Sequence, residues 1–345
     1  MPLIRQDALY DYTKKIFEAA GVPAEHAQRV ARMLVDADTA GYPSHGVNRL
    51  QQYLNAIKTG KINPQAKPVI ELESASYANI NGNRAFGQIA ATFTAEVAIK
   101  KAKNGMAMVG GYNMSHVGRL GDYTAMVARK DLMAVAFCNG GGPNVAPYGS
   151  RERVLGTNPI ACSVPSSSGK VAQFDFASAA SAEGKLNVAR NKGERVMEGL
   201  IQDKDGRPTT DPNDFYDGGS ILPIGWQKGS ALCIMMEILG GIFTGGRCSA
   251  FEGYVDGNGI VILAMKPDLF RNRADFDKDI ELMHRAVTGS QKAVGFERIL
   301  FPGEPEIEFR EKSLREGIPL DDTTWETVRG IGDSLKVPAP TGVDK

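Results

Sequence analysis

Two of the four histidines in this 345-residue chain stand in similar surroundings. His45 and His116 each follow a serine and precede a glycine by one or two positions, in the segments Ser44-His45-Gly46 and Ser115-His116-Val117-Gly118. Polar side chains among glycines are a common setting for ligand-binding and reactive groups. An imidazole with an ordinary pKa of ~6.5 can give or take a proton near neutral pH. These two histidines are therefore candidates for acid–base catalysis.

Arg49 lies four residues after His45, so both side chains can share one face if a helix begins near Gly46. A guanidinium group binds a carboxylate at two points, and an imidazole can protonate a developing alkoxide. Reduction of a 2-oxo acid requires these two functions together. The same residues also fit a plain helix start, in which Ser44 caps the helix and His45 and Arg49 form ordinary hydrogen bonds.

The other two histidines have a different setting. His26 lies in a polar helical turn and His284 lies among charged residues, so we expect both at the surface. The acidic residues are dispersed along the chain, and no C-x-x-C pair occurs. We therefore expect no metal site.

Two glycine-containing segments border predicted strands, at residues 139–144 (NGGGPN) and 156–159 (GTNP). Glycine lets a ligand approach the backbone closely, although a plain turn explains either segment equally well. Lys228 precedes an apolar helix, and a helix N-terminus favours phosphate or carboxylate. No G-x-G-x-x-G follows a strand and no G-x-x-x-x-G-K-[ST] occurs, so neither the common dinucleotide-binding fold nor a P-loop is predicted.

The elements that must position these residues follow from the spacing of apolar side chains. The first quarter of the chain has helical spacing, which predicts helices over residues 9–20, 23–37 and 47–58. Beyond residue 68, short apolar runs alternate with helices. These runs predict strands over residues 106–111, 132–138, 159–164, 171–176 and 260–265, with helices over residues 85–103 and 118–130.

The later part of the chain is predicted to be mostly helical. Residues 229–244 read as an apolar helix that is buried on most sides. Helices are expected over residues 275–287, 310–316 and 321–330, with a short strand over residues 296–301. The predicted fold class is α/β: a mixed-sheet lobe (71–266) between helical N-terminal (1–70) and C-terminal (267–345) segments that pack together.

The composition excludes several classes of protein. Lysine and arginine number 40, aspartate and glutamate also 40, and no basic block occurs, which argues against a nucleic-acid partner. The longest apolar stretch, residues 232–243, is shorter than the ~20 residues that span a bilayer, and charges in the first turns exclude a signal peptide. Four cysteines without paired spacing favour a reducing, cytoplasmic setting, and none has a histidine beside it to activate it as a nucleophile.

Six segments, taken in order, resemble the type-2 malate/L-lactate dehydrogenase family. They are residues 44–49 (SHGVNR), 115–118 (SHVG), 156–159 (GTNP), 208–212 (PTTDP), 228–229 (KG) and 302–304 (PGE). The resemblance covers most of the chain. It implies an oxidoreductase that uses NAD or NADP on a small 2-oxo or 2-hydroxy carboxylate. It also implies a cofactor lobe that is not of the Rossmann type, and a homodimer with its active site between lobes.

The resemblance also implies roles for individual residues. His45 matches the proton donor of one branch and His116 that of another, and we favour His45. Arg49 matches a contact to the substrate carboxylate, and Ser44, beside His45, is counted with these three as a catalytic residue. Cofactor contacts are implied for Asn139, Thr157, Asn158, Asp175, Ala177, Lys228, Pro302, Gly303 and Glu304. No metal ion is implied.

The turn at residues 226–230 (WQKGS) most resembles the 2,3-diketo-L-gulonate reductase branch, whereas residues 175–178 (DFAS) are closer to the general family pattern. The substrate therefore stays open. Alternatives are a malate, L-lactate, sulfolactate or ureidoglycolate dehydrogenase, or a reductase of cyclic imino acids such as piperideine- or pyrroline-2-carboxylate. A metabolite-binding protein without catalysis is the alternative outside the enzymes.

Overall fold

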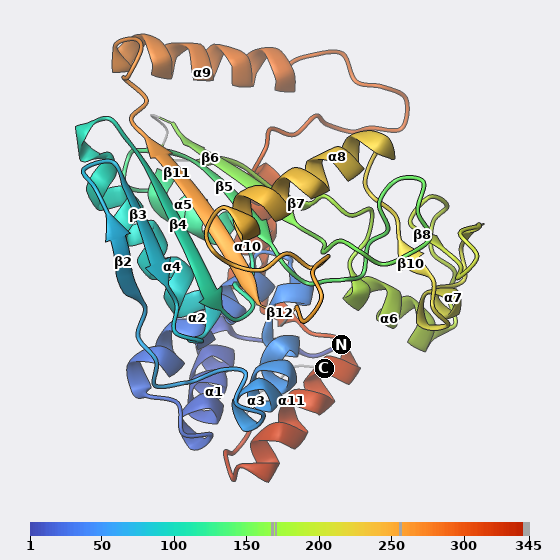
Figure 1. Cartoon of the computed structure of the whole chain (residues 1–345). Coiled ribbons are helices and arrows are strands. Elements are labelled where there is room, and N and C mark those ends of the chain that lie inside the picture. Colours follow the sequence, from blue (N-terminus) through green and yellow to red (C-terminus); the bar gives the residue numbers. More distant parts are fainter. Residues whose placement is uncertain (167–168, 170, 255–256, 341–345) are drawn as a thin grey trace.

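The computed structural model describes residues 1–345 apart from 167–168, 170, 255–256 and 341–345 (Figure 1). A seven-stranded sheet forms its centre, in the spatial order β2-β3-β4-β11-β5-β6-β7. Neighbouring strands are antiparallel, except that β3 and β4 are parallel. The strand bounds are Val69–Glu73 (β2), Tyr77–Asn81 (β3), Met106–Met114 (β4), Met133–Asn139 (β5), Pro159–Pro165 (β6), Val171–Ala177 (β7) and Asn258–Met265 (β11).

Strand pairing brings several strand ends to one edge of the sheet. Asn258, at the start of β11, pairs with Met114 at the end of β4, and the next residue of β11 pairs with Asn139 at the end of β5. β7 ends at Ala177, which pairs with Pro159 at the start of β6. We call the ends of β4, β5 and β7 together with the starts of β6 and β11 the Asn139 edge.

Helices cover both faces of the sheet. α4 (Gly87–Lys101) and α5 (Gly121–Ala128) contact one face, and α8 (Gln227–Met236) crosses the other (Figure 1). α8 continues as a π-helical segment, Glu237–Ile242, that contacts β5 and β11. The contact face of α4 consists largely of buried alanines, whose small side chains let the helix approach the sheet closely.

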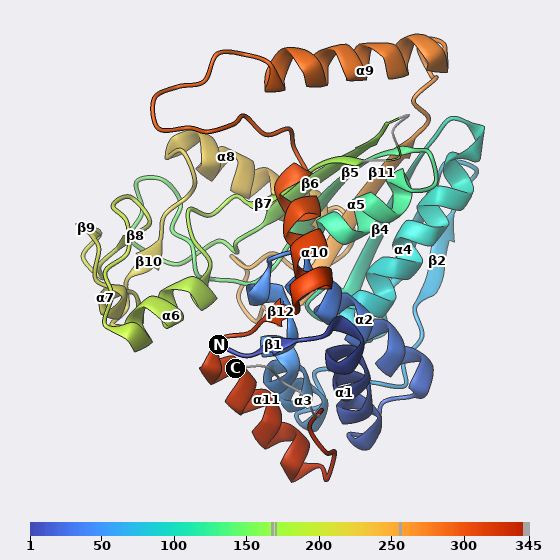
Figure 2. The ribbon, with the colours of Figure 1, turned by 180° about the vertical axis from the view of Figure 1, so that it is seen from behind.

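The two ends of the chain share a second core below the sheet (Figure 2). α1 (Gln6–Ala19), α2 (Ala24–Thr39) and α3 (Leu50–Lys58) pack there with α11 (Asp322–Ser334). The strands β1 (Leu3–Ile4) and β12 (Ile318–Pro319) pair antiparallel and tie the ends together. We call these elements the terminal helical unit. Two 3-10 turns, Pro43–His45 and Val47–Arg49, link α2 to α3.

The remaining elements form a small lobe and two outer helices. The small lobe has its own core and contains β8 (Ile201–Gln202), β9 (Pro208–Thr209), β10 (Ser220–Ile221), α6 (Glu183–Lys192) and α7 (Pro212–Tyr216). A 3-10 turn, Ala102–Asn104, follows α4. α10 (Glu304–Glu316) runs from the sheet toward the terminal helical unit (Figure 2).

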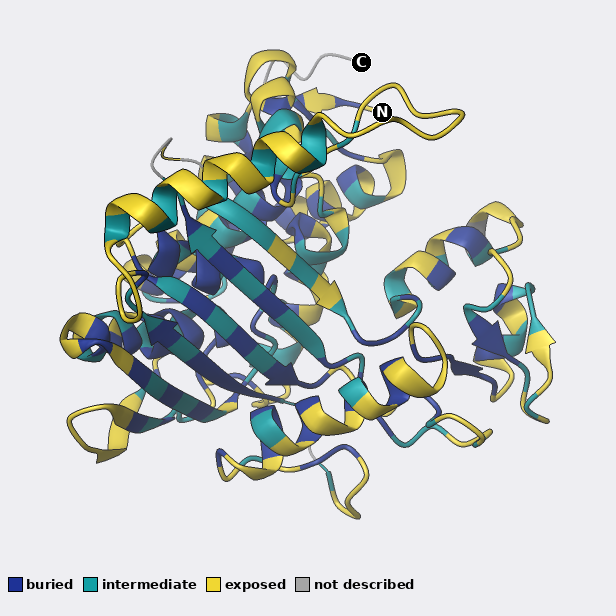
Figure 3. Cartoon of the chain, turned by 90° about the horizontal axis from the view of Figure 1, so that it is seen from above, coloured by how far each residue is buried: buried dark blue, intermediate teal, exposed yellow. Residues whose placement is uncertain are grey.

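α9 (Arg273–Thr288) stands apart at the far end of the molecule, and none of its residues is buried (Figures 1 and 3). Polar contacts join it to the body: Arg273 pairs with Asp131 at 2.6 Å, and His284 Nε2 lies 2.8 Å from Glu304 Oε1. The helix is therefore attached mainly by its polar side chains, while its apolar positions remain accessible.

The five strands expected from apolar runs are all present, as β4, β5, β6, β7 and β11. The prediction of a strand at residues 296–301 is wrong. This segment is largely exposed, and no strand of the described residues pairs with it. The helix at residues 229–244 is present, but it is not buried on most sides. Its outer face exposes Ile234, Met235, Ile238, Ile242 and Phe243.

His26 is buried, contrary to the expectation of a surface residue. Its Nδ1 donates a hydrogen bond to the backbone carbonyl of Pro64 at 2.8 Å, which satisfies the ring in the interior. Within the described ranges, no helix is both long and apolar enough to cross a bilayer. The domain boundaries at residues 70 and 266 stay predictions, and residues 341–345 lie outside the described part.

Candidate active site

His45 and His116 lie face to face. Their ring centroids are 5.6 Å apart and the ring planes differ by 20°. His45 ends the first 3-10 turn of the terminal helical unit, whereas His116 lies two residues beyond β4, at the Asn139 edge. The fold thus brings the two Ser-His segments together where the terminal helical unit meets the sheet.

Asp38 of α2 fixes the turn that carries His45 by a hydrogen bond to its backbone. Asp38 is 4% exposed, and its Oδ2 accepts a hydrogen bond from the Val47 backbone N–H at 2.8 Å. Burial raises the pKa of Asp38 to about 8. A Cβ on Gly46 would lie 1.8 Å from Asp38 Oδ1, so glycine is required by the close approach of this carboxyl group.

Ser44 and Arg49 complete the same turn. Ser44 Oγ lies 3.0 Å from His45 Nδ1. Arg49 donates from Nε to the Ser44 carbonyl at 2.6 Å and from Nη1 to Gln52 Oε1 at 2.8 Å. These two bonds fix the direction of the guanidinium and leave further N–H donors without partners in the part of the chain that the structure describes. Arg49 is therefore pre-oriented to receive an anionic group.

The loop that carries His116 is held on both sides. Ser115 Oγ accepts the first N–H of α4, that of Gly87, at 2.9 Å, and the Val117 N–H donates to Asn258 Oδ1 at 2.8 Å. A Cβ on Gly87 would lie 2.3 Å from the His116 carbonyl oxygen, so the helix start packs directly on this loop. His116 is therefore placed by backbone contacts to α4 and β11.

A buried tyrosine also contacts His116. Tyr53 of α3 has its hydroxyl oxygen 2.9 Å from His116 Nδ1 and receives a hydrogen bond from Gln88 Nε2 at 2.6 Å. Neither Tyr53 nor Gln88 was predicted from the sequence. Tyr53 lies four positions after Arg49, which is one helical turn, and this spacing is the one signal that could have marked it.

The surroundings favour neutral imidazoles. Burial lowers the pKa of His45 to about 3, and the positive charges of Arg49 and Arg119 act in the same direction. Burial, with Arg49 and His45, also holds the pKa of His116 well below its usual value. At neutral pH both rings are therefore uncharged.

Arg119 is a second cation near this pair that was not predicted from the sequence. It is 7% exposed, its guanidinium lies 4.4 Å from the centroid of the Tyr42 ring, and it pairs with Asp122 at 3.6 Å. Tyr42 in turn donates a short hydrogen bond to Glu306 of α10. Arg119 lies three residues after His116, and this closeness in sequence could have marked it as a residue of the same site.

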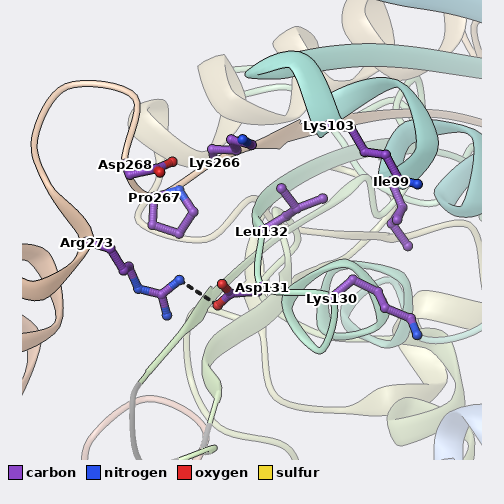
Figure 4. A pocket seen from close by; sticks show the side chains of 9 residues that line it. All are labelled: Ile99, Lys103, Lys130, Asp131, Leu132, Lys266, Pro267, Asp268 and Arg273. Atoms are coloured by element: carbon purple, nitrogen blue, oxygen red, sulfur yellow. Dashed lines mark hydrogen bonds and ion pairs between the residues drawn. The ribbon is translucent and has the colours of Figure 1, made fainter.

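A separate pocket of about 480 Å³ lies at the other end of the sheet, where β5 begins and β11 ends (Figure 4). Its lining includes Lys103, Lys130, Lys266 and the Arg273–Asp131 ion pair. Because the Asn139 edge holds the opposite ends of these two strands, this basic pocket is distinct from the histidine site.

Comparison with known proteins decides the family. The family model described as malate/L-lactate dehydrogenase matches residues 4–329. The malate/(S)-sulfolactate dehydrogenase of Methanothermus fervidus is 40% identical over 330 residues, which is 94% of this chain and 95% of that protein. The chain belongs to the malate/L-lactate dehydrogenase family. It is therefore an oxidoreductase of hydroxy acids that works with a nicotinamide cofactor, and the resemblance found in the sequence is confirmed at the family level.

Solved structures of similar proteins share the whole fold. The structure of sulfolactate dehydrogenase from Methanocaldococcus jannaschii has a TM-score of 0.88 at 33% identity and covers 98% of each chain. Malate dehydrogenase from Pyrococcus horikoshii OT3 has a TM-score of 0.89 at 31% identity and covers 98% of this chain and 97% of its own. The expected mixed α/β class is confirmed.

Four of the expected cofactor residues gather at the Asn139 edge. The Asn139 side chain donates to Glu237 and to the Arg247 carbonyl and accepts from the Gly259 N–H. Asn158 accepts from the Gly140 N–H at 3.1 Å and donates to the Cys233 carbonyl at 3.0 Å. Both amides are buried and engaged in these bonds, so they hold the two glycine-containing segments, residues 139–144 and 156–159, which we call the glycine loops. Thr157 and Ala177 beside them are partly exposed.

Lys228 lies in the first turn of α8, exposed to solvent. Ser230 Oγ of the same turn accepts the Tyr148 N–H at 3.0 Å, and one turn later Cys233 Sγ donates to the Gly156 carbonyl at 3.3 Å, so α8 contacts the second glycine-containing segment. No ion pair of Lys228 occurs among the described residues. An ammonium group, the N–H groups of a ten-residue helix and the Thr157 hydroxyl are donors suited to a diphosphate, so the residues present fit a dinucleotide.

Asp175 and the segment Pro302–Glu304 lie nearer the start of β7 than Ala177 does. Asp175 Oδ2 accepts the Gly121 N–H at 2.7 Å, and burial raises the pKa of Asp175 to about 6. The Pro302 carbonyl accepts from the Gln173 N–H at 3.2 Å, and Gly303, with φ 94°, begins α10. Glu304 contacts His284. The structure therefore places residues 302–304 beside the first half of β7, away from Ala177.

Glu237 in the π-helical segment is a further residue that sequence reasoning missed. It is buried and accepts hydrogen bonds from Asn139 at 3.1 Å, from the Gly156 N–H at 3.1 Å and from Ser249. Burial raises the pKa of Glu237, but the bonds from Ser249 and Asn139 outweigh it and the pKa is lowered. This carboxylate joins the two glycine segments of the Asn139 edge.

Proposed function

We propose that this chain transfers hydride reversibly between a nicotinamide cofactor and C2 of a small 2-hydroxy carboxylate. The observation that supports it is the neutral, face-to-face pair of His45 and His116 beside the pre-oriented guanidinium of Arg49. A base for the hydroxyl proton and a binding group for the carboxylate are the two protein functions that this reaction needs.

In oxidation, Arg49 binds the substrate carboxylate and His45 accepts the hydroxyl proton. A nicotinamide held along the Asn139 edge would supply the acceptor for the hydride from C2. Ser44 Oγ, 3.0 Å from His45 Nδ1, orients the ring. A carboxylate bound at Arg49 offsets the positive charge that lowers the pKa of His45, so binding makes the ring more basic and prepares it to hold the proton. In reduction the same proton returns to the oxygen on C2.

For the substrate we propose malate or sulfolactate. The support is the 40% identical relative named malate/(S)-sulfolactate dehydrogenase and the solved sulfolactate and malate dehydrogenases. Both compounds carry a second acidic group, and the buried Arg119 near His45, which pairs with Asp122 at 3.6 Å, is the second cation that would receive it. 2,3-Diketo-L-gulonate stays a prediction from the turn at residues 226–230.

We propose that the cofactor, NAD or NADP, lies along the Asn139 edge. Lys228 and Thr157 would bind its diphosphate, and Asn139, Asn158 and Glu237 would hold the glycine loops in place for it. Asp175, Ala177 and Pro302–Glu304 stay predicted contacts along β7. Binding is measured by the change in nicotinamide fluorescence on titration with NADH and with NADPH.

We propose that the protein acts as a homodimer in a reducing compartment such as the cytoplasm. The exposed apolar face of α8 and the unburied helix α9 support the dimer, because monomers rarely expose such surfaces without function. The four free thiols of Cys138, Cys162, Cys233 and Cys248 support the compartment.

The test is a substrate panel measured in both directions with both cofactors. It contains malate, sulfolactate, lactate, ureidoglycolate, 2,3-diketo-L-gulonate, the matching 2-oxo acids and piperideine-2-carboxylate. We expect the highest kcat/KM for malate or sulfolactate. A preference for piperideine-2-carboxylate would make the protein an imino-acid reductase. Binding of the panel without any change in the nicotinamide absorbance would favour a metabolite-binding protein and overturn the proposal.

A further inference from the structure

A chain of three polar groups, Gln88–Tyr53–His116, leads from the interior into the site. Gln88 and Tyr53 are each 1% exposed. Gln88 comes from the first turn of α4, Tyr53 from α3 and His116 from the loop after β4. The chain therefore joins the terminal helical unit to the sheet, and the proposed proton transfer by His45 does not use it.

The direction of these hydrogen bonds follows from the number of protons available. The Tyr53 hydroxyl carries one proton and has two neighbours. The Gln88 amide nitrogen donates to the hydroxyl oxygen, so the Tyr53 proton is not used on Gln88 and its one other neighbour among the described residues is His116 Nδ1. If His116 Nδ1 donated instead, the buried Tyr53 O–H would have no acceptor, so the hydroxyl donates to Nδ1. Burial raises the pKa of Tyr53 to about 12, so the hydroxyl keeps this proton at neutral pH.

The opposite orientation of Gln88 is less favourable. In the present orientation Gln88 Oε1 has no hydrogen-bond partner within the described residues. Rotation of the amide by half a turn would leave the NH2 group in that position instead. A buried N–H without a partner is rarer and more costly than a buried carbonyl without one. The orientation with Nε2 on Tyr53 is therefore the preferred one.

A neutral imidazole that accepts at Nδ1 carries its proton on Nε2. No partner of His116 Nε2 occurs in the part of the chain that the structure describes. This N–H is on the side of the ring away from Tyr53, and the ring stacks with His45 in the site. A donor at this position can bind the C2 oxygen and stabilise the negative charge that develops on it.

We propose that Gln88 and Tyr53 are positioning residues that hold His116 in the Nε2–H tautomer, so that His116 donates a hydrogen bond to the substrate oxygen while His45 transfers the proton. This assignment deepens the proposed function and rests on it. It separates the two histidines by role: one exchanges a proton with the substrate, and the other keeps its own proton.

The tautomer is measured directly by nitrogen NMR of protein labelled with ¹⁵N-histidine, without substrate or cofactor. The chain has four histidines, so spectra of His45→Asn and His116→Asn assign the two site rings. We expect His116 Nδ1 to give the signal of an unprotonated nitrogen and Nε2 that of a protonated one. A protonated Nδ1 in the unmodified protein overturns the proposal.

Tyr53→Phe removes the hydroxyl and keeps the ring. We expect a mixture of His116 tautomers and a kcat lower by ~10–10², with KM changed less, because the donor is lost only in part of the molecules. Gln88→Leu removes the other member of the chain and should give the same mixture, which keeps the test available if one variant folds poorly. An unchanged His116 spectrum in both variants contradicts the positioning role.

Tyr12→Phe is the matched control, because Tyr12 is a buried tyrosine whose hydroxyl has no hydrogen-bond partner among the described residues. Its spectrum and kcat should equal those of the unmodified protein. If the spectra follow the prediction but no compound of the panel reacts, the tautomer assignment stands and the proposed function fails. If the panel reacts and Nδ1 is protonated, the reverse holds.

Discussion

At the scale of residues, the site stacks two imidazoles close to the positive charges of Arg49 and Arg119. Proximity of His45, His116 and Arg49 makes a proton on either ring unfavourable, in addition to the effect of burial. A cation this close to a general base is explained if the substrate brings a negative charge. The bound carboxylate then compensates Arg49, and the basicity of His45 depends on whether the substrate is present.

Replacement of the two histidines separates their roles. His45→Asn should lower kcat by ~10²–10⁴, because the proton has no acceptor, while the affinity for reduced nicotinamide stays near normal. His116→Asn should lower kcat less, since an amide can still donate a hydrogen bond. Initial rates and fluorescence titrations measure both effects. If His116→Asn abolishes turnover and His45→Asn leaves it unchanged, the two roles are reversed.

The pH dependence of oxidation follows from the lowered pKa of His45. A histidine with a pKa of about 3 remains a base from neutral pH down to that value. The kcat/KM for oxidation, which reports the free enzyme, should therefore show no break near the usual histidine pKa of ~6.5. In reduction His45 must be protonated, so kcat/KM should fall as pH rises. Because burial raises the pKa of Asp175 to about 6, the contradicting result is a break near ~6.5 in oxidation that persists in Asp175→Asn.

At the scale of elements, the site depends on two turns that other elements hold. α2 supports the His45 turn through Asp38 and Gly46, and α4 supports the His116 loop through Gly87. Neither contact can be predicted from the sequence, because the sequence around a glycine does not show which group packs against it in the folded chain. The Ser-His-Gly segment was recognised by its residues, but the reason for its glycine came from the carboxyl group of α2.

Gly46→Ala tests the support by Asp38. The added Cβ would meet Asp38 Oδ1 at 1.8 Å, so the turn must shift and carry His45 and Arg49 with it. We expect kcat/KM to fall by at least ~10-fold and the protein to lose ~1–3 kcal/mol of stability. Gly330→Ala in α11 is the control, since nothing lies within 4 Å of the position that its Cβ would take. It should keep activity, and thermal unfolding and initial rates distinguish the two variants.

The sequence predicted the buried strands of the sheet better than its exposed outermost strand, β2. β4, β5 and β11 are apolar runs and were found, whereas β2 is exposed along its whole length and has no pattern of alternating burial. The Tyr53–His116 contact joins positions 63 residues apart, and only the packing of α3 against the loop after β4 creates it. The hydrogen bonds that engage the side chains of Asn139 and Asn158 were likewise set by tertiary structure.

At the scale of the whole molecule, two apolar surfaces have no partner in the described chain. α8 and its π-helical continuation expose Ile234, Met235, Ile238 and Ile242, and α9 exposes Leu282 and Met283. A single helix of the length of α9, 16 residues, is only marginally stable unless it packs against another surface. In the proposed homodimer, a second copy of the chain would cover these surfaces.

The dimer is tested by light scattering coupled to gel filtration. The unmodified protein should elute with twice the chain mass of 37.1 kDa. Met283→Glu places a charge on the apolar side of α9 and should shift the population toward monomer, whereas Lys278→Glu places the same charge on an exposed polar position and should not. A monomer in the unmodified protein at micromolar concentration refutes the arrangement.

The reaction itself is tested most directly by following the hydrogen on C2. Malate or sulfolactate carrying deuterium at C2 is converted with the oxidised cofactor, and the reduced nicotinamide is examined by mass spectrometry. We expect the deuterium to appear in the reduced nicotinamide, and His45→Asn to slow its transfer without redirecting it. Deuterium found in water, or no reduced nicotinamide from any hydroxy acid of the panel, would contradict hydride transfer from C2 at this site.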